Sequence, residues 1–285
     1  SLMIFIADSG STKADWKILH TSGEVTSQST RGFNPFIQNS EAIKVGLLKD
    51  FADSVERTKA EAVFYYGAGC SDDYRNSIVE VALQKIFPNA KITVNHDLLA
   101  SARAVCGTEA GIACILGTGS NSSLYDGIEI IDNVRNMGFL VGDEGSGSHI
   151  GKELLRGYFY REMPKDILID FNKSFPEGHR GILDRIYDNP KPNVYLASFS
   201  KFLSNHKGHP YIQHLVFKSF DEFVKRHVLK YDGCQNLKIH FVGSVAYYFK
   251  DILEIVLASY DLEIGNVIKK PINRLVDFHQ KIASK

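Results

Sequence analysis

The segment Met3-Ile-Phe-Ile-Ala-Asp-Ser-Gly-Ser-Thr-Lys13 decides how the first part of this 285-residue chain folds. Its apolar half predicts a buried strand, and the strand-like run Ala14-Asp-Trp-Lys-Ile-Leu19 follows at once. Residues 8–13 are therefore the turn of a predicted hairpin. Because Gly10 and its small neighbours let the backbone curl tightly, the turn can offer N–H groups to a phosphate, and Asp8 can help hold a hydrated metal ion. An ordinary hairpin turn explains the same residues, so other segments must decide.

The composition is that of an ordinary globular protein and argues against several classes of partner. Hydrophobic residues make up 44% and charged residues 23%, and 33 basic residues balance 33 acidic ones. With no net charge and no basic arm, nothing favours binding to nucleic acid or to a membrane surface. No apolar run approaches the roughly 18 residues of a membrane span, and no secretory signal is recognisable. We expect a cytoplasmic protein whose oligomeric state stays open, with a homodimer as one common outcome.

Cysteine and histidine spacing gives no sign of a metal site. The four cysteines have no Cys-x-x-Cys spacing, which favours buried free thiols over disulfides or metal ligands; they are Cys70, Cys106, Cys114 and Cys234. The ten histidines are scattered, so zinc is not expected. The stretch 145–152 superficially resembles a Walker A loop, but its spacing differs and Glu153 replaces the required Ser or Thr.

The chain alternates strand and helix patterns and then repeats this arrangement. In the first hundred residues, apolar runs predict strands at 3–7, 14–19, 62–66 and 91–95, and helical spacing predicts helices at 40–59, capped by Ser40, and at 71–87. The pattern restarts near residue 107, with strands at 112–116 and 122–126 around a small-residue turn. Two such halves predict an α/β protein of two abutting lobes, each with a mixed sheet flanked by helices, and a cleft between them.

The later part of the chain is expected to be mostly helical. Residues 147–231 have helical spacing, except for an irregular proline-containing stretch at 176–192. A strand at 237–242 then leads through Gly243 into a helix that ends near residue 260. A short strand and a terminal helix at 273–282 finish the chain.

Four segments carry residues suited to chemistry, and each has an ordinary structural explanation beside it. Thr118 lies in a second small-residue turn, which is also common in plain hairpins. Asp97 ends a strand where open α/β sheets place ligands, or it caps the following helix. Gly142-Asp-Glu-Gly-Ser-Gly147 puts two acids among three glycines, which suits a polar site or a solvated loop. Gly243 allows close approach of a flat ligand, or simply turns a strand into a helix.

Taken in order, these segments resemble the motifs of a known superfamily. Asp8-Ser-Gly-Ser-Thr12, Gly117-Thr-Gly-Ser-Asn121 and Val242-Gly-Ser-Val245 are similar to the phosphate 1, phosphate 2 and adenosine motifs of the acetate and sugar kinase/Hsp70/actin superfamily. Gly142-Asp-Glu-Gly-Ser146 and the segment ending at Asp97 resemble its N-acetylglucosamine kinase branch, within the BadF/BadG/BcrA/BcrD-type ATPase family. The resemblance covers essentially the whole chain.

The resemblance implies a fold and a division of the chain. It implies two ribonuclease-H-like, or actin-like ATPase, lobes with five-stranded mixed sheets, and ATP and sugar bound in the interlobe cleft. The lobes would comprise residues 3–106 and 107–270, and the C-terminal helix at 271–285 would pack back on the first lobe.

The resemblance also implies a role for each matching residue. Asp97 matches the catalytic base, which also contacts the sugar, and Asp8 matches the residue near Mg²⁺. Asn34 in Gly32-Phe-Asn-Pro35 matches a sugar-binding asparagine. The remaining sugar contacts would come from Asp143 and the backbone at Met137 and Gly138. The residues implied to bind ATP and its phosphates are Asp8, Gly10, Ser11, Thr12, Lys13, Gly117, Thr118, Gly119, Gly243 and Ser244.

The implied reaction is transfer of the γ-phosphate of ATP, with Mg²⁺, to the 6-hydroxyl of N-acetylglucosamine or a related amino sugar. Asn136-Met137 stands where the animal enzymes have glycine and tryptophan, and serines replace glycines in the first turn. The sugar therefore stays open among N-acetylglucosamine, glucosamine, another amino sugar and glucose.

Two other hypotheses stand beside the sugar kinase. An ATP-driven activator of a dehydratase or reductase would hold an iron–sulfur cluster with paired cysteines, which the sequence does not show. A catalytically silent sugar-binding regulator is disfavoured by the intact Asp8, Asp97 and Asp143.

Overall fold

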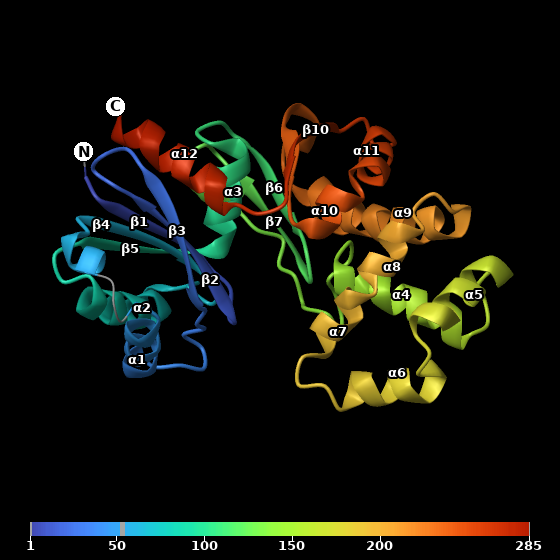
Figure 1. The fold of residues 1–285 in the computed structure, drawn as a ribbon. Helices are drawn as coiled ribbons and strands as arrows, with labels where there is room; N and C mark the ends of the chain where they lie inside the picture. The colour runs from blue at the N-terminus through green and yellow to red at the C-terminus, as the bar shows by residue number, and fades with distance from the viewer. Residues whose placement is uncertain (1, 52–54, 285) are drawn as a thin grey trace. The chain divides into compact units, whose positions relative to one another are not determined.

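The computed structural model describes residues 2–51 and 55–284, which divide into two compact units. The first unit comprises Ser1–Gly107 and Pro271–Lys285, and the second unit comprises Thr108–Lys270. Each unit holds one five-stranded mixed sheet with helices packed on it (Figure 1). The predicted fold class, an α/β protein with two such sheets, is confirmed.

The sheet of the first unit has the strand order β3-β2-β1-β4-β5. The β1 and β4 strands pair in parallel, as do β4 and β5, whereas β2 pairs antiparallel with both β1 and β3. The sequence did not predict β3, because its residues are almost all polar and Thr30 is the one buried among them. The strands are β1 (Ile4–Ser9), β2 (Lys13–Leu19), β3 (Val25–Arg31), β4 (Ala62–Gly67) and β5 (Lys91–His96).

Two helix pairs pack on the first sheet. The face of the sheet under α1 and α2 is filled by an aromatic cluster of Phe5, Trp16, Phe51 and Phe87. The rings of Trp16 and Phe51 pack edge to face, with their centroids 5.3 Å apart. The C-terminal helix α12 contacts α3, β1 and β2. The elements are α1 (Ser40–Asp50), the 3₁₀ helix η1 (Val55–Lys59), α2 (Asp73–Ile86), α3 (Asp97–Cys106) and α12 (Ile272–Ala283).

The predicted helix at 40–59 was wrong in two respects. It ends at Asp50, and a separate 3₁₀ helix follows at Val55–Lys59, while residues 52–54 lie outside the described part. The cap is Asn39 rather than Ser40, because the Asn39 side chain accepts a hydrogen bond from the Ala42 N–H at 2.9 Å. The Ser40 hydroxyl instead donates to the Ile78 carbonyl at 2.7 Å.

The sheet of the second unit repeats this topology with the order β10-β9-β6-β7-β8. An antiparallel hairpin of β6 and β7 lies beside β8, and β9 and β10 run parallel to β6. The strands are β6 (Gly111–Leu116), β7 (Ser120–Tyr125), β8 (Ile130–Asp132), β9 (Lys238–Val242) and β10 (Glu263–Ile268).

The second unit is richer in helix, and α6 lies within the stretch that was predicted to be irregular. The pattern was weak because α6 buries only Ile182. The helices are α4 (Gly147–Phe159), α5 (Lys165–Ser174), α6 (Gly178–Tyr187), α7 (Pro192–Ser198), α8 (Ser200–Asn205), α9 (Pro210–Arg226), η2 (Val228–Lys230), η3 (Cys234–Asn236), α10 (Ser244–Tyr248) and α11 (Lys250–Ala258).

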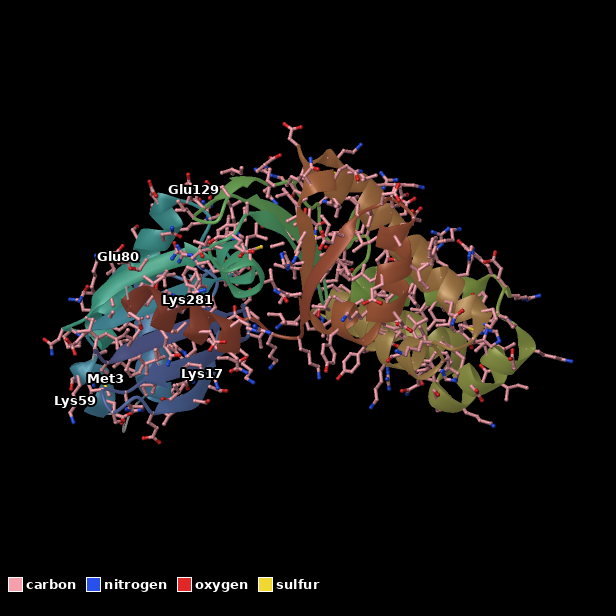
Figure 2. All side chains as sticks on the ribbon, turned by 90° about the horizontal axis from the view of Figure 1, so that it is seen from above. Met3, Lys17, Lys59, Glu80, Glu129 and Lys281 are labelled. Carbon is pink, nitrogen blue, oxygen red and sulfur yellow. The ribbon has the colours of Figure 1, made fainter. Side chains whose placement is uncertain are left out.

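The surface and the thiols follow the expectations from composition. Charged side chains such as Lys59, Glu80 and Lys281 lie exposed on the outside of the first unit (Figure 2). All four cysteines are free and buried, as predicted. Among the described residues, no helix has the length and apolar character needed to cross a membrane.

Candidate functional site

The predicted site residues of the first unit lie at the carboxyl ends of its parallel strands. In the sheet register, Ser9 of β1 is paired with Gly67 of β4, and Gly67 is paired with His96 of β5. Asp8 and Asp97 therefore come from β1 and from the end of β5 at one edge, with β4 between them. This is the edge at which α/β sheets bind ligands.

The first hairpin turn is short and packed against Gly32. The Gly10 N–H donates to the Lys13 carbonyl at 3.0 Å, and the Gly32 N–H donates to the Thr12 carbonyl at 2.9 Å. A Cβ atom on Gly32 would lie 1.9 Å from the Gly10 carbonyl oxygen, so only glycine fits. The side chains of Ser11, Thr12 and Lys13 are exposed, and the Lys13 ammonium lies 3.3 Å from Asp15.

Asn34 connects the predicted sugar-binding loop to this turn. Its Nδ2 donates to the Ser11 hydroxyl at 3.4 Å, while its Oδ1 accepts from the Phe36 N–H at 3.0 Å. The amide is therefore oriented by its own loop, with its nitrogen directed toward the turn. The structure brings these two predicted segments together.

Asp97 is the first residue of α3, and it is not the helix cap. That role belongs to His96, whose Nδ1 accepts from the Leu98 N–H at 2.9 Å. The same Nδ1 lies 2.7 Å from Asp97 Oδ1, and the Asp97 side chain is 40% exposed. Burial raises the pKa of the Cys70 thiol to about 12, and the negative charge of Asp97 adds to this shift. The Asp97 carboxylate is thus partly accessible to solvent and contacts His96. Sequence reasoning missed that His96 caps α3 and contacts Asp97.

The second hairpin turn is held by the start of α4. The Gly117 N–H donates to the Gly119 carbonyl at 3.0 Å. The Gly147 N–H donates to the Gly117 carbonyl at 2.7 Å, and the Ser148 N–H to the Thr118 carbonyl at 3.1 Å. These bonds use helix N–H groups that would otherwise be unsatisfied. Within residues 2–51 and 55–284, the Thr118 and Gly119 N–H groups have no protein acceptor, so they are free to bind phosphate oxygens.

Gly243 lies against this second turn. Val242 is in register with Ile115 on one side and with Ile268 on the other. Gly243 has a φ of +127°, and a Cβ atom there would lie 2.2 Å from the Leu116 carbonyl oxygen. The predicted phosphate and adenosine segments of the second unit are therefore neighbours.

Two adjoining pockets open beside these glycines. A pocket of about 250 Å³ is lined by Gly117, Thr118 and the α7 end, and one of about 370 Å³ lies along α8 and Tyr248. Both are lined by Ser200, Ser244 and Val245, so the two pockets adjoin at these residues. Sequence reasoning missed the contribution of α7 and α8, because they carry no motif. The α8 residues that line the larger pocket are Ser200, Lys201, Ser204 and Asn205.

Asp143 is fixed beside the second turn by Asn136. The Asp143 backbone is left-handed, with a φ of +60°, and the residue is 6% exposed. Its Oδ1 accepts from the Ser120 N–H at 3.0 Å and from Asn136 Nδ2. Asn136 Oδ1 in turn accepts from the N–H groups of Asp143 at 3.1 Å and Gly138 at 3.3 Å. Asn136, which was noted only as a departure from the family, is thus the residue that orients Asp143.

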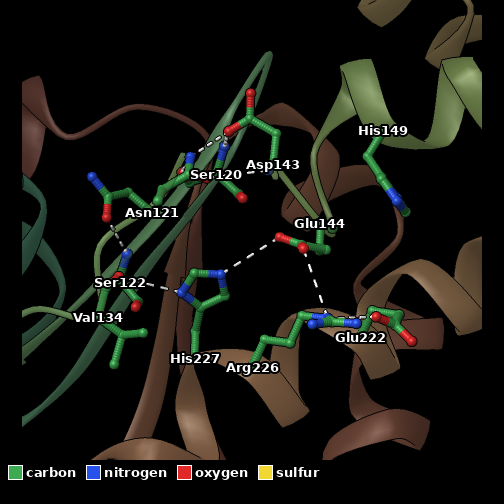
Figure 3. Close-up of polar contacts among 12 residues, drawn as sticks. Ser120, Asn121, Ser122, Val134, Asp143, Glu144, His149, Glu222, Arg226 and His227 are labelled. Carbon is green, nitrogen blue, oxygen red and sulfur yellow. Dashed lines mark hydrogen bonds and ion pairs between the residues drawn. The ribbon is translucent and has the colours of Figure 1, made fainter. Parts of the chain in front are cut away.

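Glu144 points toward Arg226 and His227, whereas Asp143 lies beside Ser120 (Figure 3). Its Oε1 lies 3.7 Å from Arg226 Nε, and its Oε2 lies 3.7 Å from His227 Nε2. Met137 is 65% exposed, and Gly138 has a φ of +79°. The two adjacent acids therefore belong to different environments.

The residues present fit a nucleotide and a hydrated magnesium ion. Gly117 has no atom within 4 Å of a would-be Cβ, which leaves a cradle beside the free N–H groups of the second turn. No group of three or more His, Cys, Asp or Glu side chains among the described residues could hold a metal ion. Mg²⁺ does not need one, because it keeps several waters and binds one or two carboxylates together with substrate phosphates. Asp8 can supply such a carboxylate.

Comparison with solved structures relates this geometry to known proteins. A protein from Porphyromonas gingivalis, provisionally named N-acetylglucosamine kinase, is 38% identical over 98% of this chain and 99% of its own, with a TM-score of 0.89. One from Chromobacterium violaceum with the same provisional name is 12% identical over 97% of this chain and 98% of its own, with a TM-score of 0.71.

A more distant likeness is to another protein with the actin-like ATPase fold. MreB 5 of Spiroplasma citri, solved with AMPPNP bound, is 10% identical over 100% of this chain and 98% of its own, with a TM-score of 0.56. Below 25% identity such a likeness shows the fold alone. No protein-family model and no curated protein sequence matches the chain.

Proposed function

The chain belongs to the N-acetylglucosamine kinase-like family of the acetate and sugar kinase/Hsp70/actin superfamily, and from this premise we propose that it phosphorylates an amino sugar with ATP. The proposed acceptor is the 6-hydroxyl of N-acetylglucosamine or a close relative. ATP supplies the phosphoryl group, and Mg²⁺ would neutralise charge on its phosphates.

The observation that carries the proposal is the composite pocket, made of the two adjoining ones, beside the second turn. Its small end is lined by Gly117 and Thr118, and its large end runs along α8 and Tyr248. Two free N–H groups at the small end suit phosphate oxygens, and the larger end suits a nucleoside. The MreB relative binds an ATP analogue on the same fold, which supports this use of the pocket.

Asp97 is the proposed general base. Its carboxylate is partly exposed at the edge of the first sheet where α/β sheets bind ligands, and it lies 2.7 Å from His96 Nδ1. Phosphoryl transfer leaves the protein to position the acceptor and remove its proton. We assign that proton to Asp97, which would take it as the sugar oxygen attacks the γ-phosphate. A positioned base of this kind is worth about 10²–10⁴-fold in rate.

Asp143 and Asn34 are proposed to select the sugar. Asp143 Oδ1 is occupied by Ser120 and Asn136, and its other oxygen is directed away from Ser120 (Figure 3). That oxygen can accept a hydrogen bond from a sugar hydroxyl. A buried carboxylate left without this partner would be costly, so the contact discriminates between sugars. Asn34, and the backbone at Met137 and Gly138, complete the proposed contacts.

The buried thiols argue against the activator alternative. An iron–sulfur cluster shared between subunits needs cysteines at a surface. Cys70 and Cys114 are 2% and 0% exposed, and Cys106 and Cys234 are 8% and 7% exposed. A colourless, iron-free preparation is the expected result.

The test is a coupled assay of ADP release with Mg²⁺–ATP and a panel of sugars. The panel contains N-acetylglucosamine, glucosamine, N-acetylmannosamine and glucose. We expect sugar-dependent ADP release, strongest with an N-acetylhexosamine, and a product in which the phosphate is on O6 by NMR. Absence of sugar-dependent release with every member would overturn the kinase, and a product phosphorylated elsewhere would overturn the 6-hydroxyl.

A further inference from the structure

A second pocket in the second unit lies on the Glu144 side of the segment 134–144, which we call the strap. Its volume is about 470 Å³, within the range of small-molecule sites. Gly142 and Glu144 line it, whereas Asp143 between them turns its carboxylate toward Ser120. The remaining walls are Val134 to Met137 of the strap and the C-terminal end of α9 with η2. This pocket shares no lining residue with the proposed nucleotide pocket.

The lining of this pocket carries more positive than negative charge. Four cations, Arg135, Lys225, Arg226 and Lys230, face two acids, Glu144 and Glu222. Both acids are already paired, because Arg226 Nε lies 2.6 Å from Glu222 and 3.7 Å from Glu144 (Figure 3). One arginine is therefore shared by the two carboxylates, which leaves one negative charge among them unmatched.

The other cations differ in whether they have a partner. Lys225 pairs with Asp221 at 2.8 Å along the same helix. The side chains of Arg135 and Lys230 have no acid and no hydrogen-bond acceptor among residues 2–51 and 55–284. With Asp221 included, four cations stand against three acids, so the pocket keeps a net positive charge, which an anion would neutralise.

The floor of the pocket is rigid. His227 is 4% exposed, and its Nδ1 lies 3.3 Å from the Val134 carbonyl, to which it donates. Its ring also stacks on Phe223 with the centroids 5.0 Å apart. Because Val134 belongs to the strap and His227 to the end of α9, this bond joins the two walls. The pocket is thus formed in advance, which lowers the cost of binding.

We propose that this pocket binds a small organic phosphate, with its phosphate held by Arg135 and Lys230. Arginine and lysine are the side chains that bind phosphate oxygens, arginine through two parallel N–H groups. The pocket is too large for the phosphate alone, and Val134 and Met137 offer apolar surface to an organic part. The inference rests on the charges and shape of the pocket, which borders the proposed sugar contact at Met137, and it does not depend on the phosphoryl-transfer step.

Calorimetric titration of the full chain tests the proposal. The probes are glucosamine 6-phosphate, inorganic phosphate and uncharged glucosamine, titrated without nucleotide at low ionic strength, since salt screens exposed charges. We expect glucosamine 6-phosphate to bind with one-to-one stoichiometry and inorganic phosphate about tenfold more weakly. The Arg135→Ala and Lys230→Ala substitutions should each weaken the organic phosphate about tenfold, which corresponds to about 1.4 kcal/mol.

Two variants serve as matched controls, and melting temperatures check that all variants fold. Lys238→Ala removes an exposed lysine of the same unit that pairs with Glu263 at 4.0 Å, and Thr118→Ala alters the proposed ATP phosphate turn. Neither should change the affinity. No binding of either phosphate, or weakening by Thr118→Ala but not by Arg135→Ala, would overturn the proposal. Equal affinities for the two phosphates would assign the pocket to inorganic phosphate instead and overturn the organic ligand.

Discussion

In the first unit, the hairpin turn at residues 10–13 accepts one hydrogen bond from the Gly32 N–H, which lies after β3. In the second unit, the turn at residues 117–119 accepts two hydrogen bonds from N–H groups at the start of α4. The first turn exposes Ser11, Thr12 and Lys13. In the second turn the carbonyls of residues 117–119 accept hydrogen bonds. Within the described part of the chain, the Thr118 and Gly119 N–H groups have no protein acceptor. The same strand order therefore supports two different kinds of proposed phosphate site, one made of side chains and one made of backbone.

The difference between the two turns indicates that the two units of a duplicated fold can have different roles. The rigid backbone turn of the second unit adjoins the proposed nucleotide pocket, so that unit is suited to hold ATP. The first unit contributes charged groups at its sheet edge, Asp8 and Asp97. We expect substitutions in the first unit to affect turnover more than nucleotide affinity, and those in the second unit to do the reverse.

The largest expected effect is that of Asp97→Asn. Loss of the proposed base should lower kcat by about 10²–10⁴-fold while leaving the nucleotide Kd almost unchanged. Steady-state kinetics and titration with AMPPNP measure the two quantities. Asp73→Asn is the control, because Asp73 is the first residue of α2 as Asp97 is of α3. Retained turnover in Asp97→Asn would show that the base lies elsewhere.

The next effect concerns the helix that completes the first unit. His279 of α12 stacks on Phe64 at 4.0 Å and lies 2.8 Å from the Tyr66 hydroxyl. Burial, helped by the charge of Arg103, lowers the pKa of His279 to about 4. In the unfolded chain its pKa is about 6.5, so the unfolded state binds the proton first as the pH falls.

The sign of this pH dependence follows from linkage. Between about pH 6.5 and pH 4 the unfolded state carries more protons at His279 than the folded state does. The free energy of unfolding therefore decreases as the pH is lowered through this interval, by about 3 kcal/mol in total. Urea unfolding at pH 7 and pH 5 should show about 2 kcal/mol of this loss in the natural chain, because the rest falls between pH 5 and pH 4. His279→Gln removes the titrating group, so its unfolding free energy should change less over the same interval. Parallel pH curves for the two proteins would refute the assignment.

A third prediction compares glycine substitutions beside the two hairpin turns. Gly243→Ala places a Cβ atom 2.2 Å from the Leu116 carbonyl, and Gly32→Ala places one 1.9 Å from the Gly10 carbonyl. Strain of about 1–3 kcal/mol at Gly243 should weaken AMPPNP binding about 10- to 100-fold. Gly32→Ala should lower kcat with a smaller loss of nucleotide affinity.

Gly208→Ala is the control for both glycine variants, because nothing lies within 4 Å of its would-be Cβ. It should bind AMPPNP like the natural chain. If Gly32→Ala weakened AMPPNP binding as much as Gly243→Ala, the proposed division between the units would be wrong.

The sequence predicted most of the fold because its patterns are local. Apolar runs such as 112–116 and the glycine and serine turns between them mark strands and hairpins without any knowledge of the partner strands. The β3 strand escaped because an edge strand that buries only Thr30 has no apolar signal. The α6 helix escaped because one buried residue, Ile182, gives no period to detect.

The candidate site was less accessible to sequence because its supports are distant along the chain. Asp143 was identified by its motif, but its orientation depends on Asn136, and α8 lines the nucleotide pocket more than 80 residues after the second turn. His96 was passed over because a helix cap gives histidine no distinctive spacing. Motifs indicate which residues can do chemistry, whereas the contacts that orient them come from packing.

The smallest expected effect tests how the second unit holds Asp143, the carboxylate proposed to select the sugar. Among the described residues, Asn136→Ala removes one of the two donors to Asp143 Oδ1 and the acceptor of the Asp143 N–H. A lost hydrogen bond to a charged group should raise the sugar KM about tenfold, with a smaller change in kcat. Asn133→Ala is the matched control, because Asn133 Nδ2 donates to Asn121 and Ser122 without touching Asp143. Equal KM values for the two variants would mean that Asp143 is held by Ser120 alone.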